Sequence, residues 1–410
     1  MINTLSIQQT LKKALVIFLL ASFCFLFPLG TKIYIYVFYL FALGLLIAQR
    51  QKLDWSCAWI RIKREMFPWM PLLLTIVILV FIHGMGGYSI YFQAFLLLFL
   101  SAVVIDKCFL TKQAVVSFLA FVTAMLSIIV VGYVLLFGLN TEILGVNKNR
   151  LLCGMTLIVS PLLGCILAND EEYSPLQVIA LGGTIALFLL ALVLSEVRTA
   201  ILGLFAILLV LLLTKSLKSF FIFLLAIIVV LAFFVFTGRL QQGWNDLQLW
   251  SNGNPNSSWG IRLELWRLAF EGLLDKPIFG WGSRPYYTLL DSGFTWTVPT
   301  FNPTHAHNDT LNFGLSNGLF GLVGWATTLL LLFKRARNNA ALLALLFSSL
   351  AMGLSERIWF DNKATLPILI CLWILFSLPF CQKSEKKKIR QHVVDLMSKK
   401  NLSFRSPSFF

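Results

Sequence analysis

Long apolar runs constrain this chain more than any other feature of its sequence. About twelve runs of roughly 16–24 residues recur along it, the length that an α-helix needs to cross the hydrocarbon layer of a membrane. Charged residues make up only 12%, against about a quarter in soluble domains. The sequence therefore predicts an all-α polytopic membrane protein of about 12 transmembrane helices in one bundle. The runs lie near 14–30, 33–48, 66–83, 90–106, 114–137, 151–168, 176–195, 199–214, 219–237, 311–333, 340–355 and 364–381.

Lysine and arginine placement predicts the orientation of this bundle. If both termini are cytoplasmic, 22 of the 33 basic residues fall in inner segments and 11 in outer segments. Because basic residues favour the inner side, we expect both termini in the cytoplasm. Much of the net charge of +15 lies in the inner loops and the tail, where it can contact anionic membrane lipid. The charge therefore does not indicate nucleic-acid binding.

One long segment interrupts the alternation of apolar runs and short loops. The predicted organisation is transmembrane helices 1–9 in residues 1–237, an outer loop at 238–310, helices 10–12 at 311–381 and a basic cytoplasmic tail at 382–410. Within the loop, residues 260–272 have the pattern of an amphipathic helix. A loop of this length is usually functional.

Two of the four histidines, His305 and His307, lie at the end of this loop, directly before an apolar run. On a continuous helix, Gly314 and Gly318 would each fall within about 20° of His307. The spacing predicts that His307 lies above a column of glycines where a neighbouring helix packs closely. Histidine can take a proton from an attacking hydroxyl near neutral pH. The alternative is a helix-packing motif with an incidental histidine.

Several arginines fall at the same outer face as these histidines. Arginine binds phosphate oxygens through paired donors, so the cluster indicates an anionic substrate. Arg198 lies between two apolar runs, and Arg262 lies on the apolar face of the predicted amphipathic helix. Alternatively, Arg198 pairs with Glu196 and Arg262 extends past the apolar face to water. The outer arginines of interest are Arg150, Arg198, Arg262, Arg284 and Arg357.

Local explanations lower the rank of two of these arginines. Arg150 has Lys148 beside it, so both can simply report membrane orientation. Glu356 and Asp361 can neutralise Arg357 locally. Arg198 and Arg262 are therefore the principal anion-binding candidates.

The absence of acidic groups from the first two outer loops bears on the chemistry. Those loops, near 31–32 and 83–89, contain no carboxylate that could hold a divalent ion. A membrane enzyme acting on a pyrophosphate here would neutralise it with arginine, without metal or cofactor. A secondary transporter of twelve spans is the alternative from another class. Transporters usually place their sites at the midplane, whereas these ionisable residues cluster at one face.

The motifs resemble the signature of bacterial lipopolysaccharide O-antigen ligases. The match is His307-Asn308, nine residues, then Gly318-Leu-Phe-Gly321, with further likeness at 197–200, 260–262 and 277–282. The resemblance implies a C-type glycosyltransferase in the inner membrane with a periplasmic active site. It would transfer O-antigen polysaccharide from undecaprenyl pyrophosphate to a hydroxyl of a lipid A–core sugar. O-antigen polymerases of the same superfamily share the histidine motif, so they stay an alternative.

The resemblance also implies roles for individual residues. His307 would be the base that activates the acceptor hydroxyl, in a single displacement that inverts the anomeric centre. Arg198 and Arg262 would hold the donor pyrophosphate, with Arg150 as a third candidate. The secondary candidates are His305, Asn308 and Arg284. The implied partners are the undecaprenyl-pyrophosphate-linked O-antigen, the lipid A–core acceptor and membrane lipid, with no metal, cofactor or nucleic acid.

Overall fold

The structure is a computed structural model that describes residues 55–89, 112–138, 142–143, 146–168, 174–214, 238–298 and 301–359, with isolated positions at 91–99 and 221–235. Within this part of the chain the architecture is helical, apart from one antiparallel pair of two-residue strands, β1 (Glu142–Ile143) and β2 (Val146–Asn147). The predicted runs near 14–30, 33–48 and 364–381 and the basic tail lie outside the described residues. Most of the runs near 90–106 and 219–237 do so too.

The described helices follow the apolar runs of the sequence. Four are long and apolar enough to cross a membrane: 62–83, 115–137, 175–195 and 309–336. Three shorter apolar helices occupy 151–165, 198–207 and 340–353. These seven segments coincide with predicted runs and confirm the all-α, multi-pass membrane class, whereas the total of twelve spans stays a prediction. The helices are α3 (Trp55–Met66), α4 (Met70–His83), α6 (Lys112–Phe137), α7 (Lys148–Ala168), α8 (Pro175–Ser195), α9 (Arg198–Thr214), α11 (Arg239–Ser251), α12 (Ser258–Asp275), α13 (Pro285–Asp291), α14 (Asp309–Ala336) and α15 (Ala340–Gly353), with short 3₁₀ turns at Phe67–Trp69 and Gly86–Tyr88.

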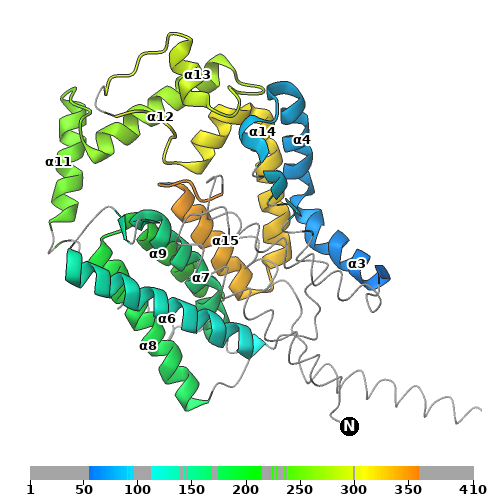
Figure 1. Ribbon diagram of the computed structural model, residues 1–410, viewed down its shortest axis with the longest axis vertical. Coiled ribbons are helices and arrows are strands. Elements are labelled where there is room, and N and C mark those ends of the chain that lie inside the picture. Colours follow the sequence, from blue (N-terminus) through cyan, green and yellow to red (C-terminus); the bar gives the residue numbers. More distant parts are fainter. Residues whose placement is uncertain are drawn as a thin grey trace, which may run out of the picture.

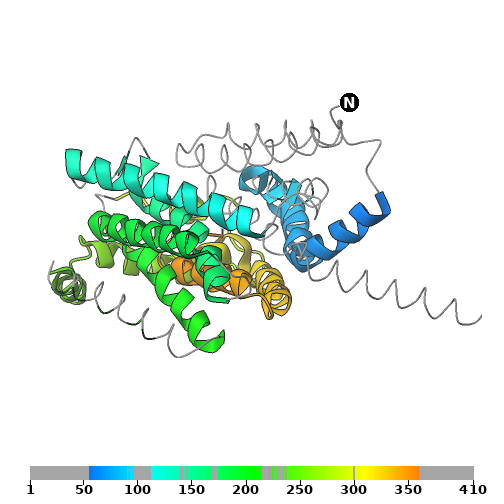
Figure 2. The ribbon, with the colours of Figure 1, turned by 90° about the horizontal axis from the view of Figure 1, so that it is seen from below.

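Helix α15 lies at the centre of the described bundle (Figure 1). It packs against α7 and α9 on one side and against α14 on the other, and α14 in turn packs against α4. Helix α6 packs against α8 and α7 (Figure 2). The three helices of the predicted loop, α11, α12 and α13, lie together at one end of the bundle, where α14 begins (Figure 1).

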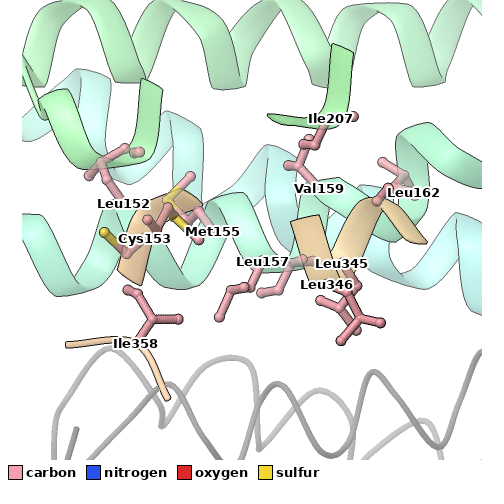
Figure 3. Close-up of a cluster of buried hydrophobic side chains, with 14 of the residues drawn as sticks. Leu152, Cys153, Met155, Leu157, Val159, Leu162, Ile207, Leu345, Leu346 and Ile358 are labelled. Carbon is pink, nitrogen blue, oxygen red and sulfur yellow. The ribbon is translucent and has the colours of Figure 1, made fainter. Parts of the chain in front are cut away.

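The core around α15 is close-packed because small residues let the backbones approach. A side chain at Gly164 of α7 would overlap the backbone of Ala341, and one at Gly203 of α9 would meet Ser348. Glycine at these positions therefore allows short distances between helix axes. Apolar side chains from α7, α9 and α15 fill the remaining space (Figure 3). They include Leu152, Met155, Leu157, Val159, Leu162, Ile207, Leu345 and Leu346.

Helix α14 is interrupted at Gly318, and a loop fills the gap. Gly318 has φ 64° and ψ −165°, a conformation essentially restricted to glycine. The break frees backbone groups that the 277–282 loop then satisfies. Leu319 N–H donates to the Pro277 carbonyl at 2.7 Å, and Trp281 N–H donates to the Leu315 carbonyl at 2.9 Å. Two motifs of the sequence, at 277–282 and 318–321, thus form one backbone junction.

This junction corrects the predicted glycine column. His307 lies outside α14, which begins at Asp309, and Gly318 breaks the helical phase. His307, Gly314 and Gly318 therefore do not share one face of a continuous helix. Gly280 faces the backbone of Asn317 and Gly318, so the close approach is between loop and helix.

Replacement of Gly318 should show how much stability this junction contributes. In Gly318→Ala, the new methyl group would overlap the backbone of Ile278, in addition to the strain of a positive φ. We expect a loss of at least about 2 kcal/mol, seen as a lower Tm in detergent. Gly182→Ala in α8 is the matched control, because nothing lies within 4 Å of its Cβ position. Equal Tm values for the two variants would contradict the role of the junction.

Candidate active site

The loop before α14 holds His305 and His307 side by side, with ring centroids 4.0 Å apart. Ala306 between them is fully buried, and its carbonyl accepts a 2.8 Å hydrogen bond from the Trp266 indole of α12. His307 adopts φ 49°, the left-handed region that non-glycine residues rarely occupy. The backbone therefore holds this histidine in a strained conformation, as is common at functional sites.

Glu356 meets both histidines from a different segment. His307 Nδ1 lies 3.2 Å from Oε1 and 3.4 Å from Oε2 of its carboxylate, and His305 Nε2 lies 3.6 Å from Oε1. Because an ionised carboxylate only accepts hydrogen bonds, the contact assigns the His307 proton to Nδ1. Nε2 of His307 is then the unprotonated nitrogen, which can accept a proton from a substrate.

Two residues at the start of α14 place Glu356 in this position. Asp309, which is 2% exposed, accepts hydrogen bonds from Ile358 N–H at 2.9 Å and Trp359 N–H at 3.0 Å. The Asn308 amide donates to the Leu354 carbonyl at 3.1 Å. The segment after α15 is thus fastened to the residues that follow His307.

Burial and hydrogen bonding set the protonation of this cluster. Burial lowers the pKa of His305 to about 4. The contact with Glu356 raises this pKa, but by less than burial lowers it. Burial alone would raise the pKa of the Glu356 carboxyl. Hydrogen bonds from His305 and His307 outweigh that effect and hold its pKa well below its usual range. At neutral pH, His305 is therefore neutral and Glu356 is ionised.

A cavity of about 380 Å³ adjoins the cluster and carries the arginines singled out by the sequence. Arg198, in the first turn of α9, and Arg262, in the second turn of α12, both line it. Leu354 and Ser355, which directly precede Glu356, and Trp266, which donates to the Ala306 carbonyl between the histidines, also line it. The remaining lining residues are Lys148, Asn149, Glu196, Thr199, Leu202, Ser258 and Trp259.

Arg262 has the environment of an anion-binding residue. Its Nε is buried and has no hydrogen-bond partner within the described ranges, and its guanidinium lies over the Trp259 ring at 5.9 Å. Burial lowers the pKa of Arg262; Glu356 opposes this effect and Arg198 adds to it. A buried, unpaired guanidinium is unfavourable unless an anion meets it. The residue as a whole is partly exposed, so the alternative that its terminal nitrogens extend to water stays open.

A second, smaller cavity of about 70 Å³ is lined in part by sequence neighbours of the cluster residues. Thr304 and Arg357, the neighbours of His305 and Glu356, both line it. Tyr88 donates a 2.8 Å hydrogen bond to Asn317 in its wall. Other lining groups are mainly polar: Tyr91, Ser283, Asn312 and Ser316, with Pro285 and Phe313. Sequence neighbours of the cluster residues thus line two cavities, one that carries Lys148, Arg198 and Arg262 and one lined mainly by hydroxyl and amide groups together with Arg357.

The structure places the secondary candidate residues in different surroundings. His305 belongs to the cluster. Asn308 acts as the N-cap of α14, where its side chain accepts from Leu311 N–H at 3.0 Å. Arg284 is exposed at the start of α13 and lines neither cavity. The side chain of Arg150 lies outside the described residues.

Two residues of the site were not predicted as such. Glu356 was assigned to neutralise Arg357, but its carboxylate faces the histidines, which lie 49 residues earlier in the chain. Asp361, the other proposed partner of Arg357, lies outside the described residues. Lys148 lines the cationic cavity. From the sequence, its position was explained by membrane orientation alone. A lysine next to an arginine at a span edge was the signal available in the sequence.

Comparison with known proteins agrees with this architecture. The model of the O-antigen ligase family matches residues 183–326, from within α8 to within α14. No curated protein matches the chain. The helices are those of a multi-pass membrane protein, and residues 183–326 are similar to a glycosyltransferase-like family of membrane enzymes. The likeness to the O-antigen ligase family, first seen in the motifs, is thereby confirmed over residues 183–326, which include Arg198, Arg262 and His307.

The low pKa of His305 predicts a loss of stability in acid. In the unfolded chain the His305 imidazole binds a proton near pH 6.5, whereas in the folded chain it binds one only near pH 4. Stability should therefore fall as the pH drops from about 6.5 to about 4, by about 3 kcal/mol from this group. The measurement is Tm against pH in metal-free buffer for the wild type and His305→Gln. The variant should lack this part of the decline, and identical slopes would contradict the prediction.

Proposed function

We propose that this protein is an O-antigen ligase of the bacterial inner membrane, with a periplasmic active site at the loop end of the bundle. It transfers O-antigen polysaccharide from undecaprenyl pyrophosphate to a hydroxyl of a lipid A–core sugar. The observation that carries the proposal is the contact of a strained histidine with a partly buried glutamate, next in the chain to residues that line a cavity with two arginines. The family match to residues 183–326 supports the same reaction class.

His307 serves as the base in this proposal, and Glu356 orients it. The acceptor hydroxyl gives its proton to Nε2 of His307 while its oxygen bonds to the anomeric carbon of the donor sugar. Glu356 accepts from Nδ1–H, so it fixes the tautomer and stabilises the imidazolium that forms. His305 packs on the His307 ring and completes the shell around the same carboxylate.

The arginines serve the leaving group. The bond between the anomeric carbon and the pyrophosphate oxygen breaks, and negative charge develops on undecaprenyl pyrophosphate. Arg198 and Arg262 in the larger cavity neutralise that charge, and Lys148 adds a third cationic group. Because the desolvated guanidinium of Arg262 meets its anion only when donor is bound, the interaction favours donor binding as well as departure. This reading requires no metal ion.

The position of the two cavities suits a single displacement. In such a reaction the nucleophile and the leaving group lie on opposite sides of the anomeric carbon, so the configuration inverts. We assign the cationic cavity to the pyrophosphate and the smaller hydroxyl- and amide-lined cavity to the acceptor side. The residues on either side of Glu356, the partner of His307, line the two cavities: Ser355 the larger and Arg357 the smaller. In this proposal a base at His307 reaches the attacking hydroxyl.

Replacement of His307 tests the mechanism directly. We expect His307→Ala to abolish transfer of polysaccharide from lipid-linked donor to core acceptor by the purified enzyme, while membrane insertion and Tm stay close to wild type. Glu356→Gln should retain a neutral partner for His307 and lose about 10²-fold or more in kcat. Near-normal transfer by His307→Ala would reject the base assignment.

Lysine substitutions test the arginines while they preserve charge. Arg198→Lys and Arg262→Lys should each raise the KM for lipid-linked donor by about tenfold, because an ammonium lacks the planar fork that matches phosphate. Arg267→Lys is the matched control on α12. Its guanidinium pairs with Glu264 at 2.9 Å and Glu271 at 2.7 Å, away from the cavity. A similar KM change in Arg262→Lys and Arg267→Lys would mean a general effect of α12 on folding and would contradict a specific role of Arg262 in donor binding.

A further inference from the structure

The histidine–glutamate cluster has a second chemical capacity that base catalysis does not use. One donor atom from each of His305, His307 and Glu356 can be chosen so that all three lie within 4.8 Å of one another. Two of the contacts converge on a single carboxylate oxygen, at 3.2 Å from His307 Nδ1 and 3.6 Å from His305 Nε2. All three side chains are partly exposed, so an ion can reach them.

These separations suit a tetrahedral transition-metal ion. Zinc binds imidazole nitrogen and carboxylate oxygen at about 2.0–2.1 Å, so neighbouring donors in a tetrahedron lie about 3.3–3.4 Å apart. The observed N–O separations of 3.2 and 3.6 Å need shifts of only a few tenths of an ångström. Two imidazoles and one carboxylate also match zinc better than magnesium or calcium, which prefer oxygen ligands.

The surroundings hold these ligands in place. The other ring nitrogen of His305, Nδ1, lies 2.8 Å from the Thr304 hydroxyl, a contact that orients the ring. The backbone between the histidines is fixed by Trp266, and the segment that carries Glu356 is fixed by Asp309. The donor set is thus preorganised before any ion arrives.

We propose that His305, His307 and Glu356 form a binding site for one Zn²⁺ ion and that the bound ion inhibits the enzyme. A metal on Nδ1 of His307 requires that nitrogen to be deprotonated, so the ring proton moves to Nε2. His307 can then no longer accept the proton of an acceptor hydroxyl. Zinc binding and base catalysis exclude each other because both use the same imidazole.

Nearby arginines limit the affinity of the site. Arg262 interacts electrostatically with Glu356, and Arg357 with His305, so a divalent cation meets repulsion from both guanidinium groups. We therefore expect reversible binding that a chelator removes. Zinc here regulates or poisons the site; it is not a structural ion.

Calorimetry on the full chain in detergent, purified without a histidine tag, tests the binding. ZnCl₂ should titrate to one ion per chain at this site, and MgCl₂ should give no comparable signal. His305→Ala and Glu356→Ala should each weaken Zn²⁺ binding by about tenfold or more. His83→Gln is the control, because that ring contacts the Phe279 carbonyl and should not affect the zinc affinity. Unchanged zinc affinity in both cluster variants would overturn the proposal.

Zinc binding does not depend on the proposed function, and only the inhibition does. Zinc should stop transfer by the wild-type enzyme, and EDTA should restore it, while EDTA alone should leave untreated enzyme fully active. Zinc bound by the cluster with transfer unimpaired would refute the inhibition and the base role of His307 together. Loss of transfer with EDTA alone would overturn the inhibitory assignment and indicate a required metal.

Discussion

The hydrogen bonds of the Asp309 carboxylate to the N–H groups of Ile358 and Trp359 hold the site together. They join the first turn of α14 to the segment that follows α15, in a position that is almost fully buried. Without that carboxylate, two buried N–H groups would lack their acceptor, at a cost of about 1–3 kcal/mol each. Because His307 precedes Asp309 by two residues and Glu356 precedes Ile358 by two, this one connection brings the His307 ring to the Glu356 carboxylate.

The second constraint is the positive charge of Arg262, which lies at the same end of the bundle. The Nε of Arg262 is buried and lacks a hydrogen-bond partner within the described residues, although the residue as a whole is partly exposed. If this position served only the stability of the fold, an apolar side chain would be more favourable there than a guanidinium. The arrangement becomes favourable when an anionic ligand completes it, as the proposed pyrophosphate donor would. At the opposite end of α14, Arg335 instead meets buried Glu65 at 3.3 Å, so the cation there has a permanent partner.

The sequence predicted those features that depend on local composition. Apolar runs located the described spans because the length needed to cross hydrocarbon is a property of a single segment. Arg198 and Arg262 were found because a charge at a span edge or on an apolar helix face is visible without tertiary information. The role of Glu356 was missed because its partners are 49 residues away and its neighbour Arg357 offered a sufficient local pairing. Helical periodicity also failed at Gly318, where a tertiary junction with the 277–282 loop breaks the helix. Asn308 before a long apolar helix is an N-cap signal, which explains its position without a catalytic role.

The lipopolysaccharide of cells that lack this gene provides the most direct test of the central claim, that the enzyme joins a finished polysaccharide to the core. We predict core without any O-antigen, together with accumulation of the polymer on its lipid carrier. The wild-type gene should reverse both defects. Core capped by a single repeat unit would contradict it and identify a polymerase. An unchanged ladder would exclude both enzymes and favour a transporter.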